Sequence, residues 1–207
     1  MVNQMPEPLA ENQHFIVRRV GEPEIASAAR IAAAARKDPK LGGEMPQPFD
    51  ELRSFYIERF TRAESKKNGL LLGLFSKDTD ELVGTVAILP LEKDVKGYHE
   101  ENYVKLLKKL LGTEKVSKSR LGFVTGLSVL GSYNKKGGAG LLSEAFEKFR
   151  LENFDYTILS TQNARVDKML TSRGYQEIGS FPDDEDTLIV WHVHCAIEPS
   201  IKKSVVA

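Results

Sequence analysis

The segment that decides the fold reads Leu127-Ser-Val-Leu-Gly-Ser-Tyr-Asn-Lys-Lys-Gly-Gly-Ala-Gly-Leu-Leu142. It predicts the end of a β-strand, a polar turn rich in glycine and lysine, and the start of an amphipathic helix. Such a turn leaves unpaired backbone N–H groups at the positive end of a helix, where they can bind a phosphate. Glycine lets the backbone approach a ligand closely, and Lys135 and Lys136 add positive charge. A flexible connection that needs positive φ angles would have a similar composition.

The familiar nucleotide-binding patterns do not fit this segment. Gly126 and Gly131 have the spacing of a P-loop, but Ser132 stands where a P-loop has lysine. Gly138 and Gly140 lack the third glycine of a dinucleotide-binding fingerprint. The turn therefore needs a different interpretation.

The sequence on either side predicts an α/β (α+β) fold. Predicted strands cover residues 15–20, 70–75, 82–89, 121–130, 155–160, 175–181 and 187–197. Predicted helices cover residues 21–37, 50–66 (with Asp50 as its cap), 98–111, 140–153 and 164–173. A strand–helix–strand unit implies a parallel pair, whereas hairpins imply antiparallel neighbours. We therefore expect a single mixed, mostly antiparallel sheet with a central parallel pair and helices on both faces.

The glycine turn resembles the coenzyme A pyrophosphate loop of the GCN5-related N-acetyltransferase (GNAT) superfamily. That loop follows a strand, reads Arg/Gln-x-x-Gly-x-Gly/Ala and opens a helix. Here Asn134 takes the Arg/Gln place, Gly137 the first glycine and Ala139 the last position. A shifted register, Lys135-x-x-Gly138-x-Gly140, fits the same pattern.

A second segment resembles a later motif of the same family, Asn-x-x-Ala-x-x-Leu-Tyr-x-x-x-Gly-Phe. It reads Asn163-Ala-Arg-Val-Asp-Lys-Met-Leu-Thr-Ser-Arg-Gly-Tyr175 and matches at Asn163, Gly174 and the aromatic Tyr175. By element order the resemblance extends over about residues 15–195, but by motif only over 126–175. Two motifs in the family's order are more specific than either one alone.

The resemblance implies a parallel pair splayed in a V, which holds the thioester and pantetheine of acetyl-CoA or another acyl-CoA. It implies direct attack of a neutral amine on the thioester carbonyl, polarised by backbone N–H groups near Val129 and Leu130, and no metal. The expected cofactor-binding residues are Leu127, Val129, Asn134, Lys135, Lys136, Gly137, Gly138, Ala139, Gly140 and Asn163.

The sequence departs from the family at three functional positions. Asn134 is neutral, Leu170 stands where many members carry the tyrosine that protonates the leaving thiolate, and Gly126 stands where some place a carboxylate base. General acid–base assistance contributes about 10²–10⁴-fold to a rate. The protein therefore recruits other groups, uses an acceptor that needs little help, or is catalytically silent.

His192 and His194 are the candidate catalytic residues. They lie two apart in a predicted strand and share one face, while Cys195 lies on the other. A histidine can act as general base near neutral pH. The two could line the slot or face solvent, and we favour the solvent-facing alternative. Because Cys195 points away, we expect no metal site.

The segment 92–120 is longer than the usual connection in this family. It predicts an amphipathic helix with lysines at 105, 108 and 109 away from the apolar face. A packed helix with a solvated lysine face is the favoured interpretation, and docking of an acidic partner such as acyl carrier protein is the alternative. The acidic run Asp183–Asp186 is either a solvated turn or an attractant for a cationic amine.

Composition bounds the organisation of the chain. Of 207 residues, 41% are hydrophobic and 28% are charged, with 29 Lys+Arg against 29 Asp+Glu, so a general nucleic-acid-binding role is disfavoured. We expect one domain over 14–198 with a helical insertion at about 92–120, and flexible segments at 1–13 and 199–207. One cysteine, no signal peptide and no apolar span predict a cytoplasmic protein; a homodimer is possible.

These observations predict an N-acyltransferase that transfers acetyl from acetyl-CoA to a primary amine on a small molecule or protein. One alternative is the transfer of a long acyl chain from acyl carrier protein or acyl-CoA. Another is a non-catalytic acyl-CoA-binding module. Zero net charge disfavours aminoacyl-tRNA as the acceptor.

Overall fold

A computed structural model describes residues 7–38, 47–92, 98–134, 136–162, 164–182 and 190–196. The chain divides into two compact units. Unit 1 holds the residues up to Pro90 together with Val124–Glu152, and unit 2 holds Leu91–Phe123 together with the residues from Asn153 onward. The strands of the described residues follow the order β1-β2-β3-β4-β5-β6-β8-β7 in one eight-stranded sheet.

Unit 1 is built on an antiparallel meander. Its strands are β1 (Ala10–Glu11), β2 (Phe15–Arg19), β3 (Leu70–Ser76), β4 (Leu82–Pro90) and the second half of β5 (Leu121–Val129). The pairs β1–β2, β2–β3 and β3–β4 are all antiparallel. The predicted hairpin between 70 and 89 is confirmed, and nearly every residue of β3 and β4 is buried. These continuous apolar runs are typical of strands covered on both faces.

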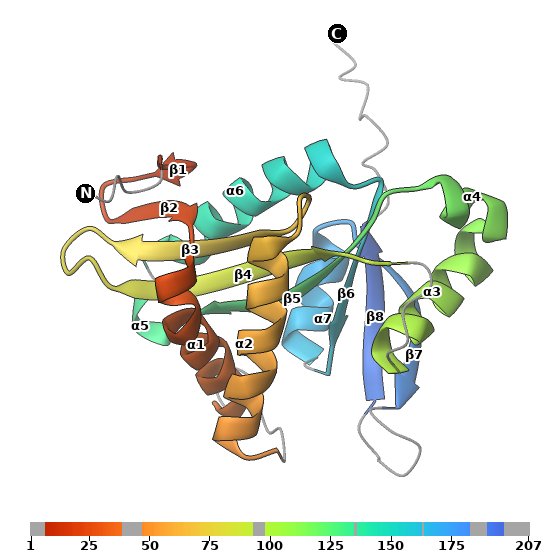
Figure 1. Ribbon diagram of the computed structural model, residues 1–207, viewed down its shortest axis with the longest axis horizontal. Helices are drawn as coiled ribbons and strands as arrows, with labels where there is room; N and C mark the ends of the chain where they lie inside the picture. The colour runs from red at the N-terminus through yellow and green to blue at the C-terminus, as the bar shows by residue number, and fades with distance from the viewer. Residues whose placement is uncertain are drawn as a thin grey trace, which may run out of the picture. The chain divides into compact units, whose positions relative to one another are not determined.

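Two long helices of unit 1 pack on β4, as the crossing ribbons in Figure 1 illustrate. The 3₁₀ turn η1 (Glu22–Glu24) leads into α1 (Ile25–Lys37), and α2 (Phe49–Ser65) contacts α1 along its length. The buried side of α1 is mostly alanine, which lets the two helices approach closely. The prediction of Asp50 as a cap is wrong: Pro48 is the N-cap, and Asp50 lies in the first turn, where its charge favours the positive helix end.

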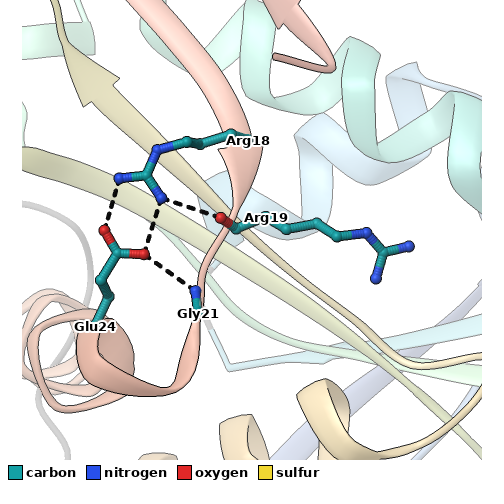
Figure 2. A network of polar contacts seen from close by, with 4 residues as sticks. All are labelled: Arg18, Arg19, Gly21 and Glu24. Carbon is teal, nitrogen blue, oxygen red and sulfur yellow. Dashed lines mark hydrogen bonds and ion pairs between the residues drawn. The ribbon is translucent and has the colours of Figure 1, made fainter. Parts of the chain in front are cut away.

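A partly buried ion pair fixes the connection from β2 to α1 (Figure 2). The guanidinium of Arg18 donates to both carboxylate oxygens of Glu24, at 2.9 Å and 2.6 Å, and the same carboxylate accepts the N–H of Gly21 at 3.0 Å. The guanidinium also lies 3.6 Å from the ring centroid of Phe75. The hydrogen bond from Arg18 holds the pKa of Glu24 below its usual value.

Unit 2 contains the parallel pair and the last three strands. β5 begins here and pairs in parallel with β6 (Tyr156–Thr161), with Leu121–Phe123 opposite Tyr156–Ile158. β8 (Val190–Ala196) is antiparallel to both β6 and β7 (Gln176–Pro182). The predicted mixed, mostly antiparallel sheet with a parallel pair is therefore confirmed.

Helices cover both faces of β8 in unit 2. On one face, the ring of His99 in α3 (Tyr98–Leu111) packs edge-on to Trp191, with centroids 5.6 Å apart. On the other face, α7 (Ala164–Ser172) contacts β6 and β7. At Gly179 of β7 the backbone has a φ of 144°, and an added Cβ would lie 2.7 Å from a methyl group of Leu106. The helix α3 thus packs directly on the backbone of β7.

Three short elements were not predicted: β1, α4 (Thr113–Lys118) and α5 (Gly131–Asn134). The helix predicted from Gly140 begins at Gly138, as α6 (Gly138–Asn153). The bounds predicted for α3 are confirmed. The acidic run Asp183–Asp186 and the segment 199–207 lie outside the described residues. None of the helices in the described ranges is both long and apolar enough to cross a membrane.

Candidate functional site

The predicted phosphate-binding turn lies in unit 1, between β5 and α6. After β5 the backbone makes the single helical turn α5, and Gly137 then adopts a φ of 82°, a conformation that side chains with a Cβ rarely adopt. The N–H of Leu141 donates to the carbonyl of Gly137 at 3.2 Å, which closes the first turn of α6. The amides of Gly138, Ala139 and Gly140 precede that bond and have no partner within the helix.

Glycine stands at the positions of this turn for different physical reasons. A Cβ at Gly137 or Gly140 would meet nothing within 4 Å, so both positions border open space. A Cβ at Gly138 would lie 2.7 Å from a methyl group of Leu74 and 3.3 Å from the ring of Phe15. Gly138 is therefore required by packing. Gly137 and Gly140 leave room for a ligand over the helix end, which fits a pyrophosphate.

The amides at the end of β5 are not equivalent. The N–H of Leu130 donates to the carbonyl of Val83 at 2.9 Å, so the expectation that it polarises a thioester carbonyl is wrong. Successive amides of a strand point to opposite edges. The N–H groups of Val129 and Leu127, one and three residues before Leu130, therefore point away from β4.

Three of the predicted cofactor residues are described only in part or not at all. Lys135 and Asn163 lie outside the described residues, and for Asn134 only the backbone is described. Lys136 is described and exposed, one residue before Gly137. The residues of the turn that the structure brings together are therefore Lys136 and the four that follow it.

The two candidate histidines lie in β8 of unit 2, and their environments differ. His194 is 0% exposed, so the solvent-facing prediction is wrong for this residue, which is covered on the α7 side. Its Nε2 lies 2.8 Å from Oδ1 of Asp167 in α7. The side chain of His192 is 46% exposed, and its Nδ1 lies 3.0 Å from Oε1 of Glu177 in a hydrogen bond.

Sequence reasoning missed Asp167 as a functional candidate. It lies within the segment 163–175 and three residues before Leu170, so both share one face of α7. The sequence held a weak signal, a carboxylate one helical turn before the position of the missing family tyrosine. The histidine opposite it is far away in sequence, and no local pattern pairs the two.

Solved structures share this arrangement of elements. The N-acyl amino acid synthase FeeM from uncultured soil microbes matches with a TM-score of 0.62 and 17% identity, over 90% of this chain and 92% of that one. An acetyltransferase from Streptococcus agalactiae matches with a TM-score of 0.60 and 12% identity, over 90% and 99%. A putative GNAT-family acetyltransferase from Desulfovibrio desulfuricans matches with a TM-score of 0.56 and 13% identity, over 88% and 98%.

This chain has the GNAT fold. The likeness is structural, since no family model matches the sequence and no curated protein matches it. The strand–turn–helix order predicted around the glycine turn is confirmed: the turn follows β5, which begins the parallel pair, and precedes α6.

Two departures from the GNAT pattern now have physical explanations. Gly126 has a φ of 65°, and a Cβ there would lie 2.5 Å from the ring of Phe60, so this site cannot hold a carboxylate without rearrangement. Leu170 is 2% exposed and contributes apolar packing. Among the described residues, no group of three or more His, Cys, Asp or Glu side chains is placed to hold a metal ion.

Proposed function

We propose that this protein is an N-acyltransferase that transfers an acyl group, most simply acetyl, from coenzyme A to a primary amine. The observation that carries the proposal is the open turn at the start of α6 in a GNAT fold, where Gly137 has a φ of 82° and a Cβ at Gly137 or Gly140 would meet no atom within 4 Å.

The coenzyme would be held by unit 1. The amides of Gly138, Ala139 and Gly140 would donate to the pyrophosphate at the positive end of α6, and the exposed Lys136 would add charge. The N–H groups of Leu127 and Val129, which point away from β4, would bind the pantetheine. Bound there, acyl-CoA would supply an activated acyl carbonyl. The amide of Val129 would stabilise the oxyanion, a contribution of about 3 kcal/mol in comparable sites.

His194 is the candidate for the group that accepts the amine proton. Its position beside a carboxylate is typical of a general base, whereas His192 is half-exposed and hydrogen-bonded to Glu177. Position 126 carries glycine in place of the family's carboxylate base, and position 170 carries leucine in place of its tyrosine acid.

Calorimetric titration with coenzyme A tests the coenzyme site. We expect Gly137→Val to abolish binding because valine strains the backbone and fills the open space. Gly140→Val should weaken binding by filling space without requiring a positive φ. The matched control is Gly112→Val, since Gly112 has a φ of 84° and also has no atom within 4 Å of an added Cβ, but lies outside the turn. Unchanged affinity in Gly137→Val would contradict the assignment.

A second candidate function is the transfer of a long acyl chain to an amine. Among the structures compared, FeeM has the highest of the three TM-scores quoted, 0.62, and is described as an N-acyl amino acid synthase. The insertion helix α3 also exposes Lys105, Lys108 and Lys109, which suits an acidic carrier protein. Activity with acyl carrier protein thioesters but not with acetyl-CoA would select this candidate.

Binding without turnover would select the third candidate, a non-catalytic acyl-CoA-binding module. Purified protein titrated with a series of acyl-CoAs, then incubated with a panel of amines, separates these alternatives. Coenzyme A binding with no product from any donor would contradict both transferase proposals.

A further inference from the structure

The helices α3 and α4 of unit 2 concentrate positive charge in a chain whose formal net charge is zero. Residues 102–120 contain five lysines and one arginine but only one acid, Glu114. All five lysines are exposed. We call their combined exposed area the lysine surface, and its members are Lys105, Lys108, Lys109, Lys115 and Lys118.

Only part of the charge on the lysine surface is neutralised. Glu114 pairs with Lys118 at 2.6 Å, but the two side chains are 83% and 75% exposed, and such an exposed pair is weak. Among the described residues no carboxylate pairs with the three lysines of α3. The lysine surface therefore attracts an anionic partner, and the attraction weakens as salt is added.

Partly exposed leucines interrupt the lysines where α3 meets α4. Leu110 and Leu111 are half-buried, and Gly112 follows them with a φ of 84°. A Cβ at Gly112 would have no atom within 4 Å, and the next residue, Thr113, is exposed. The junction of the two helices therefore lies at the surface of unit 2, with apolar side chains between lysines on either side.

The composition of the lysine surface fits a lipid membrane better than a protein partner. Protein interfaces are enriched in arginine and aromatic residues and depleted in lysine. Between residues 102 and 119, all of which the structure describes, no exposed side chain is aromatic or an arginine. Anionic headgroups attract clustered lysines without requiring a fixed geometry, and leucines beside the lysines can enter the boundary between headgroups and acyl chains.

We propose that the lysine surface binds anionic lipid headgroups and places the junction of α3 and α4 at the membrane–water interface. The lysines supply the attraction, and Leu110 and Leu111 contact the apolar boundary. The binding is peripheral and reversible, because lysine side chains act as point charges that salt screens. This inference goes beyond the proposed acyl transfer and does not depend on it, since its residues all lie in unit 2.

Sedimentation of the full chain with lipid vesicles tests the attraction. We expect tight binding to phosphatidylcholine vesicles that contain about one third phosphatidylglycerol, weak binding to phosphatidylcholine alone, and loss of the difference in high salt. Lys108→Gln combined with Lys109→Gln should weaken binding by about 25-fold, or about fivefold for each lysine. The matched control is Lys66→Gln combined with Lys67→Gln, two adjacent exposed lysines just after α2, which should leave binding unchanged.

An introduced tryptophan tests which part of the protein meets the lipid. Thr113→Trp places a reporter at the exposed junction, while the natural Trp191 is 7% exposed and gives a constant background. We expect the emission of Thr113→Trp to shift to shorter wavelength on anionic vesicles. Thr61→Trp, at an exposed position of α2, should show no shift. Vesicle binding without a shift in Thr113→Trp would overturn the placement of the junction at the interface.

The same measurements separate a membrane from an acidic protein as the partner. Equal binding to anionic and neutral vesicles would overturn the proposal, and so would equal losses in the two double-lysine variants. Binding of acyl carrier protein through Lys108 and Lys109, by a protein that does not bind anionic vesicles, would overturn it in favour of a protein partner. Urea unfolding of each variant verifies that the substitutions leave the fold intact.

Discussion

His192 and His194 lie two residues apart on the same face of β8, and each faces a carboxylate, but only one of the two histidines is buried. His194 is completely covered and near Asp167 of α7, whereas His192 is half-exposed and near Glu177 of the neighbouring strand. The difference shows that the element packed over a residue, more than its position in a strand, decides its environment. The following predictions use this difference.

The largest effect should appear in turnover. We expect His194→Leu to lower kcat by about 10²–10⁴-fold, because general base assistance is lost. His192→Leu should leave kcat unchanged. Steady-state assays with the best acyl donor would show the contrast, and equal losses in the two variants would remove the functional distinction between the pairs.

The partly buried ion pair of Arg18 and Glu24 offers a comparison in which the carboxylate is satisfied. The carboxylate of Glu24 accepts hydrogen bonds from Arg18 and Gly21, and hydrogen bonds to charged groups contribute about 1.5–3 kcal/mol. The pKa of Glu24 is held below its ordinary value of 4.5. Its stabilising contribution is therefore complete above about pH 4.5 and is lost as the pH falls through the folded-state pKa.

Urea unfolding of the wild type and Glu24→Gln across this pH range measures that contribution. We expect the difference in the free energy of unfolding between them to be largest near neutral pH and to shrink in acid. A difference that does not change with pH would show that the carboxylate charge is not what stabilises the connection to α1.

The same His194→Leu variant should gain stability. The ring nitrogen Nδ1, which has no hydrogen-bond partner among the described residues, is removed from a buried position, and replacing an unsatisfied polar group by an apolar one of similar size is neutral or stabilising. The contact of Nε2 with Asp167 is lost as well, and it offsets part of the gain. We expect a gain of about 1 kcal/mol in the free energy of unfolding, measured in urea. Loss of stability in this variant would mean that the imidazole has a structural role.

The smallest effect should come from an exposed pair. Arg120 donates to Asp155 at 2.9 Å, and this hydrogen bond lowers the pKa of Asp155. Both side chains are more than a third exposed, so the pair should contribute only about 0.2–1 kcal/mol. Asp155→Asn should destabilise the protein by no more than that, and the effect should diminish in high salt. A larger loss would indicate that the backbone hydrogen bond from Arg120 matters more than the charge.

Much of the fold was predictable because its long elements have clear periodicity. The bounds of α3 follow from its apolar spacing, and the β3–β4 hairpin follows from two apolar runs around a polar turn. The short elements carry no such signal. In α4 only Val116 is buried, and the two residues of β1 are too few to show alternation.

The candidate site was predictable only where its residues are close in sequence. The glycine turn was found because the strand, the turn and the helix follow one another. The pairing of His194 with Asp167 depends on how α7 packs over β8, which no local pattern specifies. The burial of His194 was missed for the same reason, since alternation gives a shared face but not what covers it.

The close approach of Leu106 to Gly179 has a consequence for protein engineering. A graft that replaces the 98–118 region with the corresponding segment of another protein of the same fold must preserve both the leucine and the glycine, or exchange them together. A side chain at 179 would occupy the volume that a methyl group of Leu106 now fills. Across natural variants we therefore expect residues 106 and 179 to change in concert, although they are remote in sequence.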